Sequence, residues 1–177
     1  MKNIKRIFSI LLLVVFTFTL LTGCEPKREN IEFNGDEGSI TFQLKQNGNY
    51  KISTDSKDFR TSREQAVLLG KNFRIGIEFD DDFGYFFKGD FDKLKETKKD
   101  STDYKEVTYS DIKGIQYFYS SYMRYNIILP IKDNKKYYVV LTVYGKEDNE
   151  KSAKEAINNE EVIDILNHIS KITAKKQ

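Results

Sequence analysis

The side chains that could do chemistry in this sequence are few. Cys24 is the only cysteine and His168 the only histidine among 177 residues. A nucleophile activated by histidine, or a metal held by several histidines or thiolates, needs these residue types in combination. The composition therefore argues against both kinds of site, and we predict a structural role for His168. We predict no catalytic residue, no metal site and no cofactor.

One cluster of carboxylates could still hold a cation. Residues 80–82 are three aspartates, and Asp90 and Asp92 follow within ten residues. Calcium prefers such oxygen ligands in flexible loops. The EF-hand pattern fails, however. Gly84 stands where the third ligand would be, and Phe91 stands at the twelfth position of the loop, where a glutamate is required. A solvated acidic loop is the favoured interpretation.

Three consecutive aromatic residues lie between two glycines directly after this cluster, and they are Tyr85, Phe86 and Phe87. Consecutive side chains cannot all follow one face of a strand or helix, so at least one ring is expected to be exposed. The alternative, that the rings anchor the core, stays open. Aromatic residues are enriched at interaction surfaces. We predict that Tyr85, Phe86 and Phe87 supply apolar contact for a partner, with Asp80 and Asp82 setting the polarity.

The N-terminus combines a basic start with an apolar run. Lys2, Lys5 and Arg6 precede residues 7–21, which carry no charge. A helix of this length spans about 22 Å, whereas the hydrocarbon core of a bilayer is roughly 30 Å thick. The pattern is typical of a removable signal peptide rather than of a lasting transmembrane helix.

The apolar run ends in Leu21-Thr22-Gly23-Cys24, which resembles the lipobox of bacterial lipoproteins. The resemblance implies that a diacylglyceryl group is attached to the Cys24 thiol and that cleavage follows Gly23. Two acyl chains meet the requirement for stable anchoring, so we expect the protein at the extracytoplasmic face of the cell membrane. An ordinary secretory signal followed by a chance cysteine is the alternative.

Cleavage would change the charge balance. The whole chain has 29 basic and 27 acidic residues, and the signal contains three of the basic ones and none of the acidic ones. The mature chain therefore has 26 basic residues against 27 acidic ones. A nucleic-acid binder usually shows a basic excess, so we predict no nucleic-acid partner.

The sequence predicts one globular domain, and we expect it to be a monomer. The polar residues before it, interrupted by Pro26 and Gly35, indicate a flexible tether. A strand through Ile31 and Phe33 is the alternative. The predicted segments are the signal (1–23), the lipidated cysteine and tether (24–38), the domain (39–173) and a tail (174–177).

Hydrophobic periodicity predicts strands in the first half of the domain. Residues 39–44 and 50–54 alternate between apolar and polar side chains, and Asn47-Gly48 between them is a tight-turn signal, so we predict a hairpin. Residues 73–79 alternate most regularly. One face of that strand is expected to be exposed to solvent.

Two short helices are also indicated in this half. Residues 62–65 have the form of a capping box before an apolar run that ends at Gly70, which predicts a helix. Residues 90–100 are charged, with Phe91 and Leu94 as apolar points. They are expected to form a solvated helix or a loop.

The second half reads as an antiparallel meander rich in aromatic and β-branched residues. In residues 137–144 both alternating sets are largely apolar, so both faces of the sheet should be at least partly buried. Helices are the expected covers, and residues 160–172 carry an apolar stripe at helical spacing. The predicted strands are residues 104–109, 115–122, 123–131 and 137–144.

The order of hairpin, helix, strands and terminal helix is similar to the PsbP-like family. Gly114 opens an aromatic strand through Tyr117 and Tyr119, a long hairpin covers residues 123–144, and the helix at Ile165 closes the domain. The resemblance implies an α/β (α+β) fold, a three-layer α/β/α sandwich with an antiparallel sheet covered by helices. It also implies a docking or accessory role. The alternative fold is an all-β sandwich with one terminal helix.

The sequence thus favours a non-enzymatic binding or accessory lipoprotein held at the membrane by the lipid on Cys24. An anchor and a tether would place one small domain outside the membrane, and no phosphate loop, nucleophile pair or ligand cluster accompanies it. An envelope-associated hydrolase and a purely structural envelope protein are the alternatives. The partner is expected to be an envelope protein, a peptide or a glycan.

Overall fold

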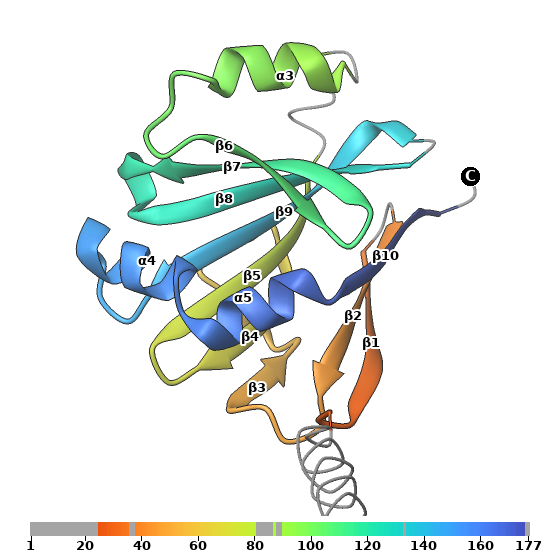
Figure 1. Ribbon diagram of the computed structural model, residues 1–177, viewed down its shortest axis with the longest axis vertical. Coiled ribbons are helices and arrows are strands. Elements are labelled where there is room, and N and C mark those ends of the chain that lie inside the picture. The colour runs from red at the N-terminus through yellow and green to blue at the C-terminus, as the bar shows by residue number, and fades with distance from the viewer. Residues whose placement is uncertain (1–24, 36–37, 81–86, 88–89, 133, 176–177) are drawn as a thin grey trace, which may run out of the picture.

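The computed structural model describes residues 25–35, 38–80, 87, 90–132 and 134–175. The larger sheet has seven strands in the order β3 (Tyr50–Ser53), β4 (Glu64–Gly70), β5 (Phe73–Asp80), β9 (Asn134–Gly145), β8 (Arg124–Ile131), β7 (Ile112–Tyr119) and β6 (Lys105–Tyr109). The smaller sheet has the order β1 (Arg28–Asn34), β2 (Gly38–Lys45) and β10 (Ile169–Ala174). All pairings among these strands are antiparallel (Figure 1).

Among the described residues, three α-helices pack against the sheets, namely α3 (Phe91–Lys98), α4 (Glu150–Ile157) and α5 (Glu160–Asn167). Two 3-10 turns, η1 (Ser56–Asp58) and η2 (Ser120–Tyr122), connect strands. The fold is therefore α+β, with mainly antiparallel sheets and helices packed on them. The predicted meander is confirmed as β6 to β9, and the strand predicted at residues 73–79 is confirmed as β5. The expectation that one face of this strand is exposed to solvent is wrong, because Arg74 and Glu78 on that face are buried.

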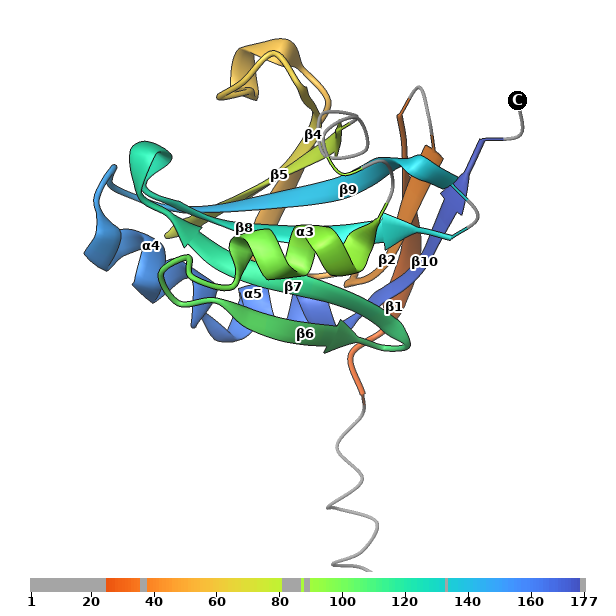
Figure 2. The same ribbon diagram turned by 90° about the horizontal axis from the view of Figure 1, so that it is seen from above.

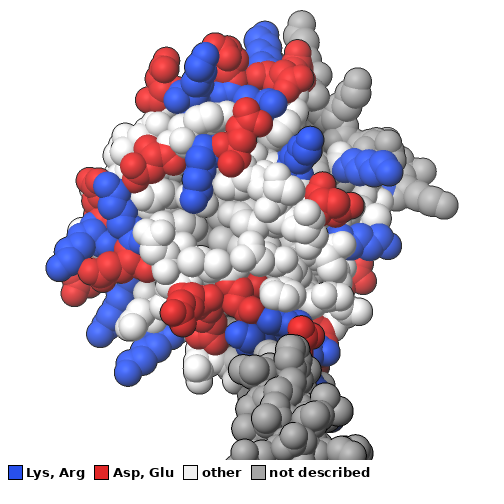
Figure 3. Space-filling view, viewed as in Figure 1, with Lys and Arg blue, Asp and Glu red and all other residues white. Residues whose placement is uncertain are grey.

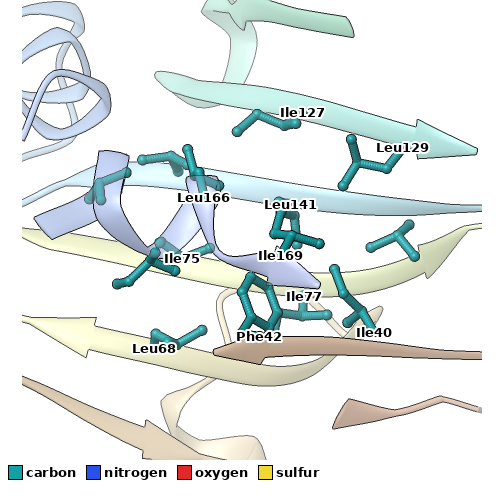
Figure 4. Close-up of a cluster of buried hydrophobic side chains, with 14 of the residues drawn as sticks. Ile40, Phe42, Leu68, Ile75, Ile77, Ile127, Leu129, Leu141, Leu166 and Ile169 are labelled. Atoms are coloured by element: carbon teal, nitrogen blue, oxygen red, sulfur yellow. The ribbon is translucent and has the colours of Figure 1, made fainter. Parts of the chain in front are cut away.

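The larger sheet is buried on both faces because β9 carries two apolar sets. Tyr137, Val139, Leu141 and Val143 point into the main core, which the small sheet, α4 and α5 cover from the other side. Figure 4 shows side chains of β2 and α5 pointing toward those of β5, β8 and β9 in this core. The small sheet thus covers this face together with the helices, whereas the sequence pattern predicted helices alone.

The opposite face of the large sheet carries a smaller core beneath α3. Leu94 is the fully buried residue of that helix, and it packs with Tyr138 and Val140 of β9. Figure 2, seen from above, shows α3 in front of β7 and β8. The expected cover of Tyr138 and Val140 is therefore a helix rather than a second sheet.

The predicted hairpin of residues 39–54 is wrong, since its two strands belong to different sheets. β2 pairs with β1 and β10, whereas β3 pairs with β4. Ile40, Phe42 and Leu44 are all fully buried in the main core. Burying this apolar face requires β2 to cross over the large sheet, which separates it from β3 in spite of the Asn47-Gly48 turn.

The helix predicted at residues 62–69 is also wrong, because this segment is strand β4. Ala66 and Leu68 alternate into the core opposite Ile77 and Ile75 of β5. Glu64, expected in a capping box, is instead buried and paired with Arg74. Contacts across the sheet thus override the local capping signal.

Two segments near the chain termini differ from the sequence predictions because both form strands of the small sheet. Residues 28–34 of the expected tether form β1, which pairs along its length with β2, so the strand alternative holds there. The helix predicted for residues 160–172 ends at Asn167, and Ile169 and Ile172 continue in β10. β1 and β10 complete the small sheet by pairing with the two edges of β2.

Figure 3 shows the charges on the face seen in Figure 1. Basic and acidic side chains are interspersed around the rim, and an uncharged surface lies in the middle. Opposite charges placed side by side largely cancel each other at a distance. On this face the described residues therefore create no extended field of one sign.

Candidate ligand-binding cleft

A cleft of about 690 Å³ opens on the α3 side of the large sheet. Side chains alternate along a strand, so β5 directs Glu78 and Asp80 to this side, and β8 directs Arg124 and Asn126 to it. All four are buried polar residues. The floor of the cleft is thus charged, although it lies in the middle of a sheet.

The walls of the cleft come from three other parts of the chain. The loop before β4 contributes Thr61, Ser62 and Arg63, and α3 contributes Lys98. Phe87 and the tyrosines of β7 and η2 complete the lining. Three segments that are far apart in the sequence therefore meet around one charged floor.

Two tyrosines at the rim of the cleft are exposed. Tyr119 is 37% exposed and Tyr122 is 55% exposed, and their ring centroids lie 5.3 Å apart. Tyr117, two residues earlier on the same side of β7, is buried, and Asn126 donates a hydrogen bond of 3.1 Å to its hydroxyl. Tyrosines of one strand and the turn after it thus differ in exposure: the first belongs to the core, and the other two form an exposed aromatic rim.

Arg124 occupies the centre of this arrangement. Its guanidinium donates a hydrogen bond of 2.5 Å to the hydroxyl of Tyr144, and its Nη1 lies 3.7 Å from Oε1 of Glu78. The guanidinium carbon lies 5.2 to 5.9 Å from the ring centroids of Tyr119, Tyr122 and Tyr144. These cation–π contacts hold the charge in place while leaving most of its N–H donors unused by the described residues.

Several buried polar atoms on this face have no hydrogen-bond partner among the described residues. They include Arg124 Nε, Asn126 Oδ1 and Thr142 Oγ1. An unsatisfied buried donor or acceptor costs about 1–3 kcal/mol. Such a group is usually satisfied by an ordered water or a ligand. The first two of these residues line the cleft.

Glu78 is the carboxylate whose protonation is most affected by the cleft. Burial raises the pKa of its carboxyl above the ordinary 4.5, Arg124 acts in the opposite direction, and the charge of Glu64 raises it further. The hydroxyl of Thr61 donates a hydrogen bond of 3.2 Å to its Oε1. A buried carboxyl with a raised pKa in a cleft is typical of functional sites.

The neighbouring carboxylates are held by arginines. Arg74 forms two hydrogen bonds with Glu64 and donates a third, of 2.9 Å, to the backbone oxygen of Asp58. Arg63 lies 3.0 Å from Asp80. Gly76 lies between Glu64 and Thr142, where a Cβ atom would overlap both side chains. The absence of a side chain at this glycine therefore makes room for the buried ion pair.

A second cavity, of about 570 Å³, adjoins the cleft. The two cavities share Thr61 and Tyr122 in their linings. The lining of the second cavity also includes Asp148 and Arg60, whose guanidinium carbon lies 4.5 Å from the ring centroid of Tyr144. Tyr122 thus stands between two adjoining hollows.

The structure places two of the predicted binding residues in the cleft lining, Asp80 and Phe87. Tyr85, Phe86 and Asp82 lie outside the described residues, as does Cys24. Arg124 and the exposed Tyr119 and Tyr122 were not among the predicted site residues. An arginine two residues after the last of three closely spaced tyrosines was the available signal, but tyrosines in a strand pattern are more often core.

The remaining candidates for chemistry lie elsewhere. His168 follows α5, and its Nδ1 lies 2.7 Å from the backbone oxygen of Asp164. Within the described ranges no group of three or more histidine, cysteine, aspartate or glutamate side chains is placed to hold a metal ion. No helix of the described part of the chain is long and apolar enough to cross a membrane.

Comparison with known proteins gave no match: no family model, no curated protein and no solved structure is significantly similar to this chain.

Proposed function

We propose that this protein is a lipid-anchored binding protein of the extracytoplasmic face and that its ligand occupies the cleft beneath α3. The observation that carries the proposal is the combination of an open cavity, exposed tyrosines and a buried polar floor with unsatisfied atoms. Ligand sites combine apolar walls with a few convergent polar groups in this way. The role is binding without turnover, as in an accessory subunit.

The place of β1 supports such an anchored arrangement. Only three residues separate Cys24 from Arg28, where β1 begins. Four extended peptide steps reach at most about 14 Å, so a lipid on Cys24 would hold the domain close to the bilayer. β1 starts at the lower end of Figure 1 and α3 lies at the upper end. The cleft would then lie on the side away from the membrane.

We also propose a fold family for this protein. We infer a PsbP-like three-layer arrangement from helices on both faces of an antiparallel sheet, with the small sheet beside α4 and α5 as an addition. Members of that family act as docking or accessory subunits, which agrees with binding without turnover.

A thermal-stability screen tests the proposal. Full-length protein from membranes is mixed with separate sets of saccharides, amino acids, short peptides and nucleotides, and its melting temperature is recorded. At least one set should raise the melting temperature, and Tyr122→Ala should abolish that rise. Ile163→Ala is the matched control, since this side chain is 42% exposed on α5, away from the cleft. If no set stabilises the protein, or if Tyr122→Ala responds like wild type, the cleft is not the site.

A hydrolase is the second candidate, and the pKa of Glu78 favours it. A buried carboxyl with a raised pKa can serve as a general acid, and Asp80 in the same cleft would be a second carboxylate. Conversion of a bound compound by wild type, lost in Glu78→Gln, would establish this alternative. Intact recovery of the bound compound supports the binding role.

A further inference from the structure

We propose that the ligand of the cleft is a linear, uncharged saccharide whose ring faces lie on the exposed tyrosines and whose hydroxyls bind the Glu78–Arg124 pair. This inference rests on the proposed function, because it names the ligand class of the same cleft. Three features of the described residues carry it, namely the shape of the cavities, the hydrogen-bonding groups of the floor and the aromatic rim.

The shape of the site fits an elongated ligand. The cleft of about 690 Å³ and the adjoining cavity of about 570 Å³ share Thr61 and Tyr122. A chain molecule can occupy both hollows at once if it passes over Tyr122. Tyr122 is the most exposed of the large apolar side chains described, at 55%. A single small molecule would fill only one of the two cavities.

The floor of the cleft offers donors and acceptors side by side. Each hydroxyl group is both a donor and an acceptor. Glu78 accepts one hydrogen bond from Thr61, and Arg124 uses one donor on Tyr144. Neighbouring hydroxyls of a sugar ring can donate to the carboxylate and accept from the guanidinium. The unsatisfied Oδ1 of Asn126 adds a further acceptor, directly or through one water.

The charges of the floor favour an uncharged ligand. Arg124 faces Glu78 at 3.7 Å, and Arg63 faces Asp80 at 3.0 Å. The third cation of the lining, Lys98, lies in the wall with its Nζ 5.4 Å from the ring centroid of Tyr117. A carboxylate or phosphate on the ligand would approach Glu78 and Asp80, and an ammonium group would approach Arg124. A ligand without net charge avoids both repulsions and still gains hydrogen bonds to charged groups, which are the stronger kind.

The aromatic rim supplies the apolar contact that such a ligand needs. The C–H face of a sugar ring is apolar while its edge is polar. Tyr119 and Tyr122 form a pair of exposed rings 5.3 Å apart at the mouth of the cleft. The rings can cover the ligand's faces while the floor binds its edge. A peptide is less suited, because the floor lies on the face of a sheet and offers side-chain groups rather than a strand edge.

Calorimetric titration of the full-length protein tests the ligand class. The protein is solubilised in a detergent without a sugar headgroup and titrated with chitotetraose, cellotetraose and maltotetraose. Tetragalacturonate and tetrapeptides of alanine and serine are the charged and peptide comparisons. We expect one neutral tetrasaccharide to bind, with an affinity that changes less than twofold between 50 and 500 mM salt, because screening acts on net charges.

Single substitutions then locate the saccharide. Tyr122→Ala should weaken its binding roughly tenfold, the loss expected for one stacked ring, and Tyr122→Phe should retain it. Glu78→Gln should weaken it several-fold, because a charged acceptor is replaced by a neutral one of the same shape. Ile163→Ala should bind as wild type. Unchanged binding by Tyr122→Ala would overturn the assignment.

The failures of the two proposals are distinguishable. If tetragalacturonate or a tetrapeptide binds in a Tyr122-dependent way and no neutral saccharide does, the cleft is the site and the saccharide assignment is wrong. If nothing in the screen or the titrations binds, both proposals fail. If a neutral saccharide binds and mass spectrometry finds it cleaved, the ligand class stands and the protein is a hydrolase.

Discussion

Arg28, at the start of β1, forms two parallel hydrogen bonds with Asp164, in the middle of α5. Its Nη2 donates to Oδ1 at 2.7 Å and its Nη1 donates to Oδ2 at 3.1 Å. Lys45 of β2 lies 3.2 Å from the same carboxylate. Residues 136 positions apart in the chain are thus joined at the end of the domain nearest Cys24.

This pair should contribute measurably to stability. Both side chains are 21% exposed, so we expect a coupling free energy of about 1 kcal/mol in a double-mutant cycle of Arg28→Ala and Asp164→Ala. Urea unfolding of the four proteins measures it. A cycle of Lys151→Ala and Glu155→Ala on the surface of α4, whose side chains are far more exposed, is the control. Its coupling should be smaller, and equal couplings would contradict the expectation.

The contribution of this pair should also depend on pH. Burial acts to raise the pKa of Asp164, but the hydrogen bonds from Arg28 and Lys45 outweigh it and hold the pKa below its ordinary 3.8. A lowered pKa in the folded state gives stability that is present above 3.8 and is lost as pH falls through the folded-state value. The coupling energy should therefore be constant from pH 7 to 5 and decline in stronger acid. A coupling that persists unchanged at pH 2 would refute this.

Glu78→Gln should stabilise the protein at neutral pH. The pKa of Glu78 is raised above 4.5 mainly by burial. Its contribution to stability is full below 4.5 and is lost as pH rises through the folded-state pKa. The variant should therefore melt at a higher temperature than wild type at pH 7.5, and the difference should disappear at pH 4. A lower melting temperature at pH 7.5 would show that the Arg124 contact dominates.

Glu64→Gln is the matched comparison, and it should lower the free energy of unfolding instead of raising it. Glu64 binds Arg74 with two hydrogen bonds, and both side chains are buried. Removing one partner of a buried ion pair costs about 3–5 kcal/mol, because the other charge remains without compensation. The two glutamate variants on one face should thus change the free energy of unfolding in opposite directions at pH 7.5.

Leu94→Ala should loosen α3 and destabilise the domain. Leu94 is completely buried and is the buried residue of this helix. Truncating a buried leucine to alanine typically costs about 2–5 kcal/mol. Urea unfolding gives the total, and hydrogen exchange should show the fastest gain in residues 91–98. Lys93→Ala, at an exposed position of the same helix, should leave both measurements unchanged.

Cys24→Ala should release the protein from the membrane if the thiol carries a diacylglyceryl group. Two acyl chains anchor stably, whereas the domain without them has no comparable affinity for a bilayer. Fractionation of cells followed by immunoblotting measures the shift to the soluble fraction. Mass spectrometry of the wild-type N-terminus gives an independent check. An unmodified Cys24, or a retained signal peptide, would contradict the lipoprotein assignment.

Only part of the cleft lining could be predicted from the sequence. Asp80 and Phe87 were predicted as binding residues from composition, and they do line the cleft. The sequence could not show that Arg124 and Tyr122 lie in the same site, because they follow some 40 residues later in the chain. They come close to β5 only because the sheet has the strand order β5-β9-β8. The tyrosines show the same limit: Tyr117 is buried and Tyr119 is exposed, although both occupy the same side of β7.

The sequence by itself determined the elements whose pattern is strong and local. These are the alternation of β5, the meander from β6 to β9, the apolar stripe of α5 and the double burial of β9, since each depends on the period of its own side chains. Only the tertiary structure decided that residues 64–70 are a strand, that β2 leaves β3 for the small sheet, and that residues 28–34 and 169–174 complete that sheet. In each of these cases a long-range partner outweighs a local signal, because pairing with β2 or β5 satisfies a whole row of backbone groups and buries an apolar face, whereas a turn or a capping box satisfies only one or two groups.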